Sequence, residues 1–178
     1  WSVGTPVQAA LDSLEILMRA HRIGAADVAR LVVRIDELGA KTVDQRNMPD
    51  INMQHLLALM LVDGTLTFAS SHDLSRVRDR AVAALRARIE LVGDEQMTRE
   101  RPVRQAALEL TTRDGRVLRH HTRAVRGTTF NPMTRGEVDA KCLDLTAPVL
   151  GARRARRLLD ALWNVDRLED VRKLRRLY

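Results

Sequence analysis

The chain has 178 residues, of which 45% are hydrophobic and 30% charged, and its formal net charge is +7. This length suits one domain with a real core, and the composition excludes an intrinsically disordered chain. The single cysteine, Cys142, excludes an internal disulfide framework, and the sequence has no apolar run of the roughly 18 residues that a membrane-spanning helix needs, so we predict a cytoplasmic protein without membrane contact.

The first third of the sequence predicts a helix, a strand and a second helix. Apolar residues recur at helical spacing in TPVQAALDSLEILMRAHR, where Thr5 is a suitable N-cap and Pro6 a suitable first helical residue. The segment DVARLVVRID has the β-branched, apolar centre that is typical of a strand. We predict a polar connection over residues 36–50 and a helix over about residues 51–62.

The strongest local signal in the sequence is a β-hairpin within residues 104–125. Leu108 and Leu110 alternate with polar residues, Asp114-Gly115 supplies a tight turn, and the strand pattern then resumes. Before the hairpin, we predict a helix that Asp73 or Ser75 caps and that continues to about residue 87, followed by a short strand at IELVG.

The end of the sequence predicts helices. Thr134 and Glu137 have the spacing of a capping box, and the helix that they begin carries Cys142 on its apolar side, where a buried and inert thiol is expected. We expect Pro148 and Gly151 to interrupt this helix and one or two amphipathic helices to follow. Together, four strands with interspersed helices predict an α+β fold, in which helices pack on a small antiparallel or mixed sheet.

Much of the positive charge lies at the C-terminal end. Residues 151–178 contain nine Arg or Lys residues and four Asp or Glu residues, a net charge of +5. These cations interleave with leucines at helical spacing, which indicates a solvated helix face or one that meets a partner domain. No aromatic RNA-binding motif or zinc finger accompanies them, so we predict no nucleic-acid partner.

Several motifs that would carry chemistry are missing or have simpler interpretations. The sequence contains no G-x-G-x-x-G, no G-x-x-x-x-G-K-[ST] and no C-x-x-C. His120 and His121 are neighbours on a predicted strand, so their side chains point to opposite faces and are poorly placed to share a metal ion. The run Ser70-Ser71-His72-Asp73 is interpreted as a helix-entry cap rather than a nucleophile site.

Three stretches of the sequence together resemble one family. They are WSVGTPVQAALDS, VDQRNMPDINMQHLLALMLVDGTLTFASSHD, and RGTTFNPMTRGEVDAKC with LEDVRKL. The chain resembles the C-terminal part of the MmgE/PrpD superfamily, which includes 2-methylcitrate dehydratase and cis-aconitate decarboxylase. The most specific pieces are QHLLALMLVDGT and the asparagine-proline loop before E-V-x-x-K.

The resemblance implies a two-domain enzyme. Residues 1–178 would form its C-terminal α+β lid domain with terminal helices, and an all-helical N-terminal domain would lie outside this chain. Such enzymes are typically homodimers, need no metal or organic cofactor, and act on small di- or tricarboxylates in the cleft between the domains. Because the chain starts at Trp1 and the helical domain supplies several catalytic residues, we expect a fragment that is inactive by itself.

His55 is the candidate catalytic residue. Taken alone, a single histidine at the start of an apolar helix is more often structural or exposed than catalytic. The resemblance changes this expectation, because the matching position is an active-site tyrosine in the cis-aconitate decarboxylase branch. A histidine, with an ordinary pKa of about 6.5, can both donate and accept a proton at neutral pH, and a helix N-terminus favours its neutral form.

Arg46 and Gln54 are the candidate substrate-binding residues. Arg46 can clamp a substrate carboxylate through its bidentate guanidinium, although an exposed loop arginine is the slightly favoured interpretation. Gln54 can orient the substrate or cap the helix. The loop with Asn131-Pro132 can close on the cleft or can form a turn before the capped helix.

We therefore predict a lyase, most simply a dehydratase of a 2-methylcitrate-like hydroxy-tricarboxylate, as used in propionate catabolism. It would remove a proton alpha to a carboxylate and eliminate the beta hydroxyl as water. Epimerisation or decarboxylation of a small di- or tricarboxylate is the alternative within the family, and histidine in place of the tyrosine argues against decarboxylation. A non-catalytic basic interaction module is the alternative from another class.

Overall fold

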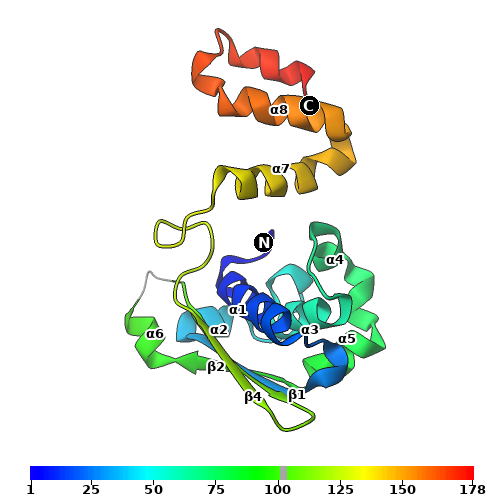
Figure 1. Ribbon diagram of the computed structural model, residues 1–178, viewed down its shortest axis with the longest axis vertical. Helices are drawn as coiled ribbons and strands as arrows, with labels where there is room; N and C mark the ends of the chain where they lie inside the picture. The colour runs from blue at the N-terminus through cyan, green and yellow to red at the C-terminus, as the bar shows by residue number, and fades with distance from the viewer. Residues whose placement is uncertain (101–103) are drawn as a thin grey trace. The chain divides into compact units, whose positions relative to one another are not determined.

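The hairpin predicted around Asp114-Gly115 forms one side of a mixed sheet in the computed structural model, which describes residues 1–100 and 104–178. The sheet has the order β2-β1-β3-β4 (Figure 1). β1 runs parallel to β2 and antiparallel to β3, while β3 and β4 are the hairpin strands. The four strands are β1 (Val28–Asp36), β2 (Ile89–Asp94), β3 (Ala106–Thr112) and β4 (Val117–Thr122). A mixed sheet with packed helices confirms the predicted α+β class.

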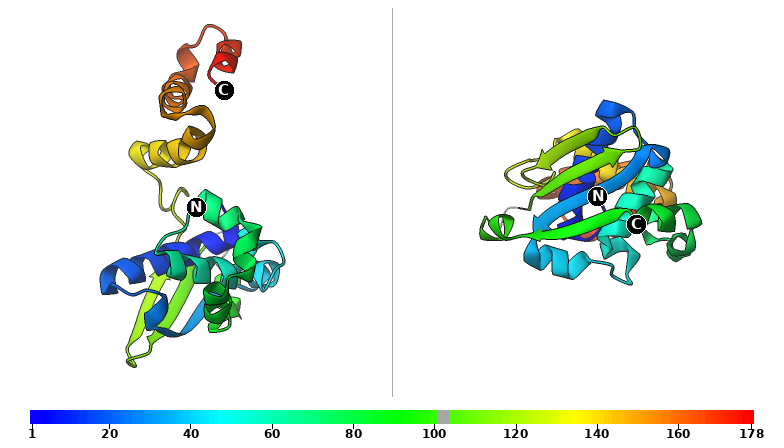
Figure 2. Two further views of the ribbon diagram at one scale, coloured as in Figure 1. Left: turned by 90° about the vertical axis from the view of Figure 1, so that its right-hand side faces the viewer. Right: turned by 90° about the horizontal axis from the view of Figure 1, so that it is seen from below.

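The chain divides into two compact units, residues 1–131 and residues 132–178, and the sheet belongs to the first. Helices α1 (Thr5–His21) and α3 (Met53–Asp63) contact the sheet, and α5 (Arg80–Arg86) contacts α3. Seen from below, the opposite face of the sheet lies in front of the helices of this unit (Figure 2). The side chains of β1 differ between the two faces of the sheet. Leu31, Val33 and Ile35 are buried in the core, while Arg30 and Arg34 are exposed.

Helix α3 is the centre of the first unit. All nine residues from Met53 to Leu61 are buried, and the helix contacts α1, α5 and β2. Helix α1 is different, because its apolar side faces the core and its other side remains exposed. The amphipathic pattern therefore describes α1 well, whereas α3 is apolar on every side because other elements surround it.

The polar connection predicted over residues 36–50 is wrong for its first half, which forms α2 (Glu37–Val43). The Asp36 side chain accepts a hydrogen bond from the Gly39 N–H at 2.9 Å and so caps this helix. Because Asp36 also ends β1, the strand passes into the helix without a loop. Asp36 is therefore an N-cap that the strand pattern concealed.

The single helix predicted to continue to about residue 87 is also wrong. It is divided into a 3-10 helix (Leu74–Arg78) and α5, because the Asp79 carboxylate accepts hydrogen bonds from the N–H groups of Ala81 and Val82 and begins a new helix. Further short elements complete the unit: α4 (Phe68–His72), α6 (Glu95–Arg99) and 3-10 helices at Ala25–Asp27 and Pro49–Ile51.

The second unit consists of α7 (Arg135–Leu150), α8 (Ala152–Trp163) and two 3-10 helices, Val165–Arg167 and Val171–Arg176. The predicted capping box is confirmed, since the Glu137 N–H donates to the Thr134 hydroxyl at 3.3 Å and the Glu137 carboxylate accepts from the Thr134 N–H at 2.8 Å. The predicted break at Pro148 is wrong, because α7 continues through it and ends before Gly151, whose φ is +78°. Pro148 lies in the last turn, where it removes only one hydrogen bond.

The prediction that Cys142 is buried is also wrong. Its side chain is partly exposed, and α7 has no buried residue along its 16 positions. The apolar spacing in this helix therefore does not correspond to a core inside the described residues.

Across the same described ranges, none of the helices has the length and apolar character required to cross a membrane.

Candidate functional site

The start of α3 holds His55 inside the protein. Asn52 is the N-cap, and its side chain accepts a hydrogen bond from the His55 N–H at 2.9 Å. The His55 side chain is only 1% exposed, and neither ring nitrogen has a hydrogen-bond partner among the described residues. Buried polar groups are normally hydrogen-bonded, so an imidazole with two free nitrogens is unusual and available for chemistry.

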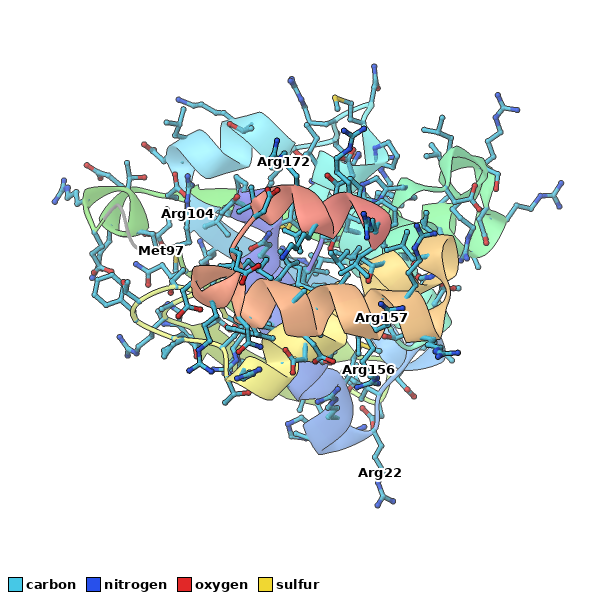
Figure 3. The ribbon with its side chains drawn as sticks, turned by 90° about the horizontal axis from the view of Figure 1, so that it is seen from above. Arg22, Met97, Arg104, Arg156, Arg157 and Arg172 are labelled. Atoms are coloured by element: carbon cyan, nitrogen blue, oxygen red, sulfur yellow. The ribbon has the colours of Figure 1, made fainter. Side chains whose placement is uncertain are left out.

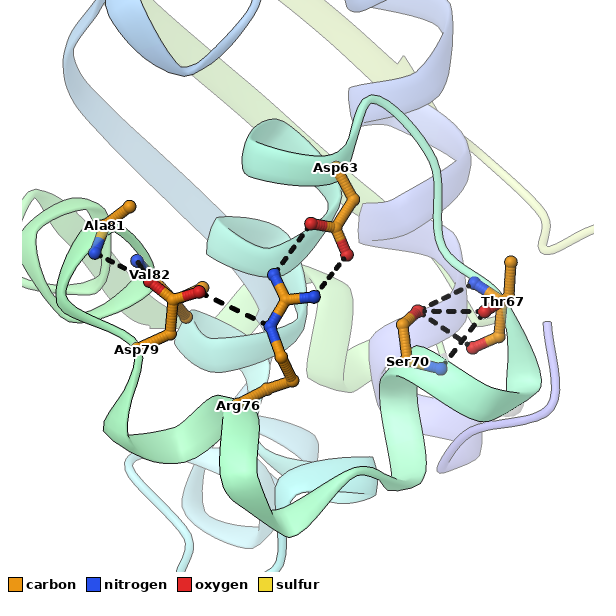
Figure 4. Close-up of polar contacts among 7 residues, drawn as sticks. All are labelled: Asp63, Thr67, Ser70, Arg76, Asp79, Ala81 and Val82. Carbon is orange, nitrogen blue, oxygen red and sulfur yellow. Dashed lines mark hydrogen bonds and ion pairs between the residues drawn. The ribbon is translucent and has the colours of Figure 1, made fainter.

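The surroundings of His55 keep its ring neutral. Burial lowers the pKa of His55 below its ordinary value, and the positive charges of Arg86 and Arg76 lower it further. Arg76 is itself held in place by two hydrogen bonds to the Asp63 carboxylate, 2.7 and 3.1 Å long, and it lies 3.5 Å from Asp79 (Figure 4). The hydrogen bond to Asp63 raises the pKa of Arg76, so this positive charge is permanent.

Gln54 connects the start of α3 to the preceding loop. Its side-chain nitrogen donates to the Asp44 carboxylate at 2.6 Å, and its side-chain oxygen accepts from the Gln45 N–H at 3.1 Å. Gln45 has a positive φ of 45°, and its own side chain accepts from Arg86 at 2.7 Å. The Gln54 amide therefore fixes a strained turn and is buried with the helix.

Arg46 lies on the outer side of the same loop. Its guanidinium is exposed and forms no ion pair with any residue that the structure describes, while its carbonyl oxygen accepts from the Asn52 side chain at 2.5 Å. The Asn52 side chain thus bridges the main chains of Arg46 and His55. The side chain of Arg46 is exposed, whereas that of His55 is buried. The structure brings all three predicted site residues to one loop–helix junction, with Gln54 and His55 buried and Arg46 in solvent.

The N-terminal stretch of family resemblance contacts both this junction and the loop that follows β4. The Gly4 N–H donates to the carbonyl oxygen of Asp50, directly before α3, at 3.0 Å. Asp12 accepts from the Trp1 indole at 2.6 Å and from the Arg126 N–H at 3.0 Å, so it joins the N-terminal segment to the loop that follows β4. Segments far apart in sequence therefore meet around the first half of α1.

Two positions in this arrangement were missed from the sequence, Asn52 and Asp12. Asn52 stands three residues before His55, which is the N-cap spacing and is recognisable in the sequence. Asp12 had no local signal, because both of its partners are brought to it by the fold. Asn131 stabilises the loop that contains it. Its side chain donates to the Ala124 carbonyl at 3.0 Å and accepts from Arg126 at 2.8 Å.

The two histidines of β4 face different partners, as predicted. His120 lies 3.1 Å from the Ser13 hydroxyl on the helix side, and His121 lies 2.8 Å from the Gln105 side chain. Among the residues that the structure describes, no group of three or more His, Cys, Asp or Glu side chains is arranged to hold a metal ion.

The cap interpretation of residues 70–73 is confirmed. Ser70 forms a reciprocal capping box with Thr67, as Figure 4 shows, and Asp73 accepts from the Ser75 N–H at 2.8 Å. Ser71 and His72 are hydrogen-bonded to each other and to the Phe68 carbonyl. These side chains begin and end two short helices, so the presence of Ser, His and Asp in this run is explained without a catalytic nucleophile.

Comparison with known proteins identifies the relationship. The family described as MmgE/PrpD C-terminal domain matches residues 1–167, which include the whole first unit and both α7 and α8. A search of curated proteins found no significant match. The matched region contains His55, Arg46 and Gln54 and all the segments that meet around α1. The chain therefore belongs to the MmgE/PrpD C-terminal domain family.

Proposed function

We propose that this chain is the α+β lid part of an MmgE/PrpD-type lyase, and that the enzyme dehydrates a 2-methylcitrate-like hydroxy-tricarboxylate. The observation that carries the proposal is the His55 ring, which is buried, neutral and without a partner for either nitrogen among the described residues. It lies in the stretch with the most specific resemblance to the family, which includes lyases.

In the proposed reaction, a base removes the proton from the carbon alpha to a carboxylate, and the electron pair of that C–H bond forms the new double bond. The beta C–O bond breaks, and the leaving hydroxyl takes a proton and departs as water. His55 is suited to move these protons. Its neutral ring can accept one, and the nearby positive charges of Arg76 and Arg86 then favour its release to the leaving group.

We propose that substrate reaches the buried His55 ring when the loop before α3 moves. The ring is 1% exposed, and hydrogen bonds from Gln54 to Asp44 and from Asn52 to Arg46 attach the loop to the helix start. We propose that Arg46, which is free of ion pairs within the described part of the chain, binds a substrate carboxylate from this loop. Binding would then displace the loop next to the catalytic ring.

We further propose that an all-helical domain of the same protein covers part of this chain and completes the active site, and that the enzyme is a homodimer without a cofactor. The family match supports the first part. The second unit supports it independently, because α7 lacks buried residues and Val149, Leu162 and Trp163 are exposed. Apolar surface of this kind is usually covered by a partner.

The test is turnover of the full-length enzyme with 2-methylcitrate, followed by NMR for loss of water, and the same spectra report deuterium exchange or release of carbon dioxide. His55→Ala should lower kcat by about 10²- to 10⁴-fold, the usual contribution of a general acid–base group. The matched control is His21→Ala, which removes an exposed histidine at the end of α1 and should leave kcat unchanged. Near-normal turnover by the His55 variant would exclude the proposed role, and exchange without water loss would indicate epimerisation.

A further inference from the structure

The second unit contains a cavity of about 520 Å³ that is largely open to solvent and that exposed arginine side chains line. Arg153, Arg154 and Arg157 come from the first half of α8, and Arg176 comes from the last 3-10 helix. Figure 3 shows Arg157 on α8. The family match ends at residue 167, so the segment that supplies Arg176 lies beyond it.

The arginines converge for two local reasons. Arg157 follows Arg154 by three residues and Arg153 by four, which places the three side chains on one face of α8. The Arg154 guanidinium also donates to the carbonyl oxygens of Arg176 and Tyr178, both at 3.3 Å. These hydrogen bonds hold the end of the chain beside α8 and bring Arg176 to the cavity.

The positive charge of the cavity is not compensated by acidic side chains within the described residues. No Asp or Glu side chain lines it. Asp160, the only acidic residue of α8, forms no ion pair within the described ranges, and neither do Arg153 and Arg157. Two other cations near the C-terminal end do form ion pairs: Arg172 pairs with Asp170, and Lys173 pairs with Glu169. Like charges three and four residues apart destabilise a helix, so this arrangement favours an added anion.

We propose that this cavity binds a diphosphate group, at a site separate in sequence from the one that contains His55. Guanidinium groups bind phosphate oxygens in pairs of parallel hydrogen bonds, and several of them are needed to balance a multivalent anion. The cavity volume falls in the range of small-molecule sites, which leaves room for a group larger than one phosphate. The diphosphate is either free or part of a nucleotide.

The test is isothermal titration of the 178-residue chain with pyrophosphate and, separately, with ADP at about 50 mM salt, where charge interactions are weakly screened. The double variant Arg153→Gln/Arg157→Gln is compared with Arg22→Gln/Arg78→Gln, which removes the same charge from exposed positions in the first unit. Figure 3 shows Arg22 pointing away from the protein. We expect one pyrophosphate per chain, a loss of affinity of about tenfold or more in the first variant, and a change below about twofold in the second.

Thermal unfolding shows that the variants are folded. Without ligand, the Arg153/Arg157 variant should melt no lower than the wild type, because it loses like-charge repulsion. Pyrophosphate should raise the Tm of the wild type and not of this variant. Tighter binding of ADP than of pyrophosphate would identify a nucleotide. The proposal is overturned by absence of binding, by equal losses in both double variants, or by citrate or duplex DNA binding as tightly as pyrophosphate.

Discussion

Replacing His55 with leucine should leave the protein as stable as the wild type at pH 7, or more stable. Both ring nitrogens are buried without partners among the described residues, and each hydrogen bond that is not made costs about 1–3 kcal/mol. Leucine fills a similar volume and has no polar atoms. After allowance for imperfect packing, we expect a gain of about 0–2 kcal/mol in the free energy of unfolding. His55, the proposed catalytic residue, is thus expected to lower the free energy of unfolding.

The pH dependence of this gain has a definite sign. The pKa of His55 is lowered in the folded protein, whereas in the unfolded chain it returns to about 6.5. Above this pH the ring is neutral in both states. As the pH falls below it, the unfolded chain takes up the proton first, so the wild type loses stability by at most about 1.4 kcal/mol per pH unit until the folded pKa is reached. His55→Leu lacks this loss, so its advantage should grow between pH 7 and pH 5.

The assay is urea unfolding followed by circular dichroism at several pH values for the wild type, His55→Leu and Leu57→Ala. Leu57 is fully buried on the same helix, and its truncation should cost about 2–5 kcal/mol at every pH. The pKa of His121 is also lowered, mainly by burial, but it is common to all three proteins and cancels in the comparison. A loss above about 1 kcal/mol in His55→Leu at pH 7 would refute the reasoning, because it would mean that the ring makes hydrogen bonds in the native state.

Two further substitutions test the contacts around α1 and α7. Asp12→Asn should lower the free energy of unfolding by about 1–2 kcal/mol and shift the fluorescence of Trp1, because the indole and the Arg126 N–H donate to different carboxylate oxygens and an amide has only one acceptor oxygen. An unchanged spectrum would mean that this bridge is not formed in solution. Thr134→Ala should cost about 1 kcal/mol and reduce helicity, because it removes the cap that is reciprocal with Glu137. An equal loss of helicity in the exposed control Thr129→Ala would contradict the cap assignment.

Elements defined by nearby residues could be predicted from the sequence. The hairpin depends on Asp114-Gly115, where Gly115 has a φ of +89°, and the helix after Thr134 depends on one capping box. Element boundaries were missed where a single aspartate ends one element and begins the next. Asp36 does this between β1 and α2, and Asp79 between a 3-10 helix and α5.

The candidate site could be predicted only as a set of positions. The start of α3 and the location of His55 in it follow from local spacing. The burial of the ring does not, because it depends on how other elements surround α3, and its neutral state depends partly on Arg76 and Arg86, which come from 21 and 31 residues further along the chain. The role of Gln54 as the anchor of the Asp44–Gln45 turn likewise appears only once the loop is folded against the helix.

The burial of α3 on all sides has a consequence for how members of the family diverge. Every residue from Met53 to Leu61 is constrained by the volume and shape of its neighbours. Apart from replacement of His55 by leucine, substitutions there would be removed by selection for a folded protein even in a descendant that had lost its reaction. A recognisable LLALML at residues 56–61 is therefore a record of packing first, and an inactive relative could retain it long after the loop residue Arg46, which no packing protects, had changed.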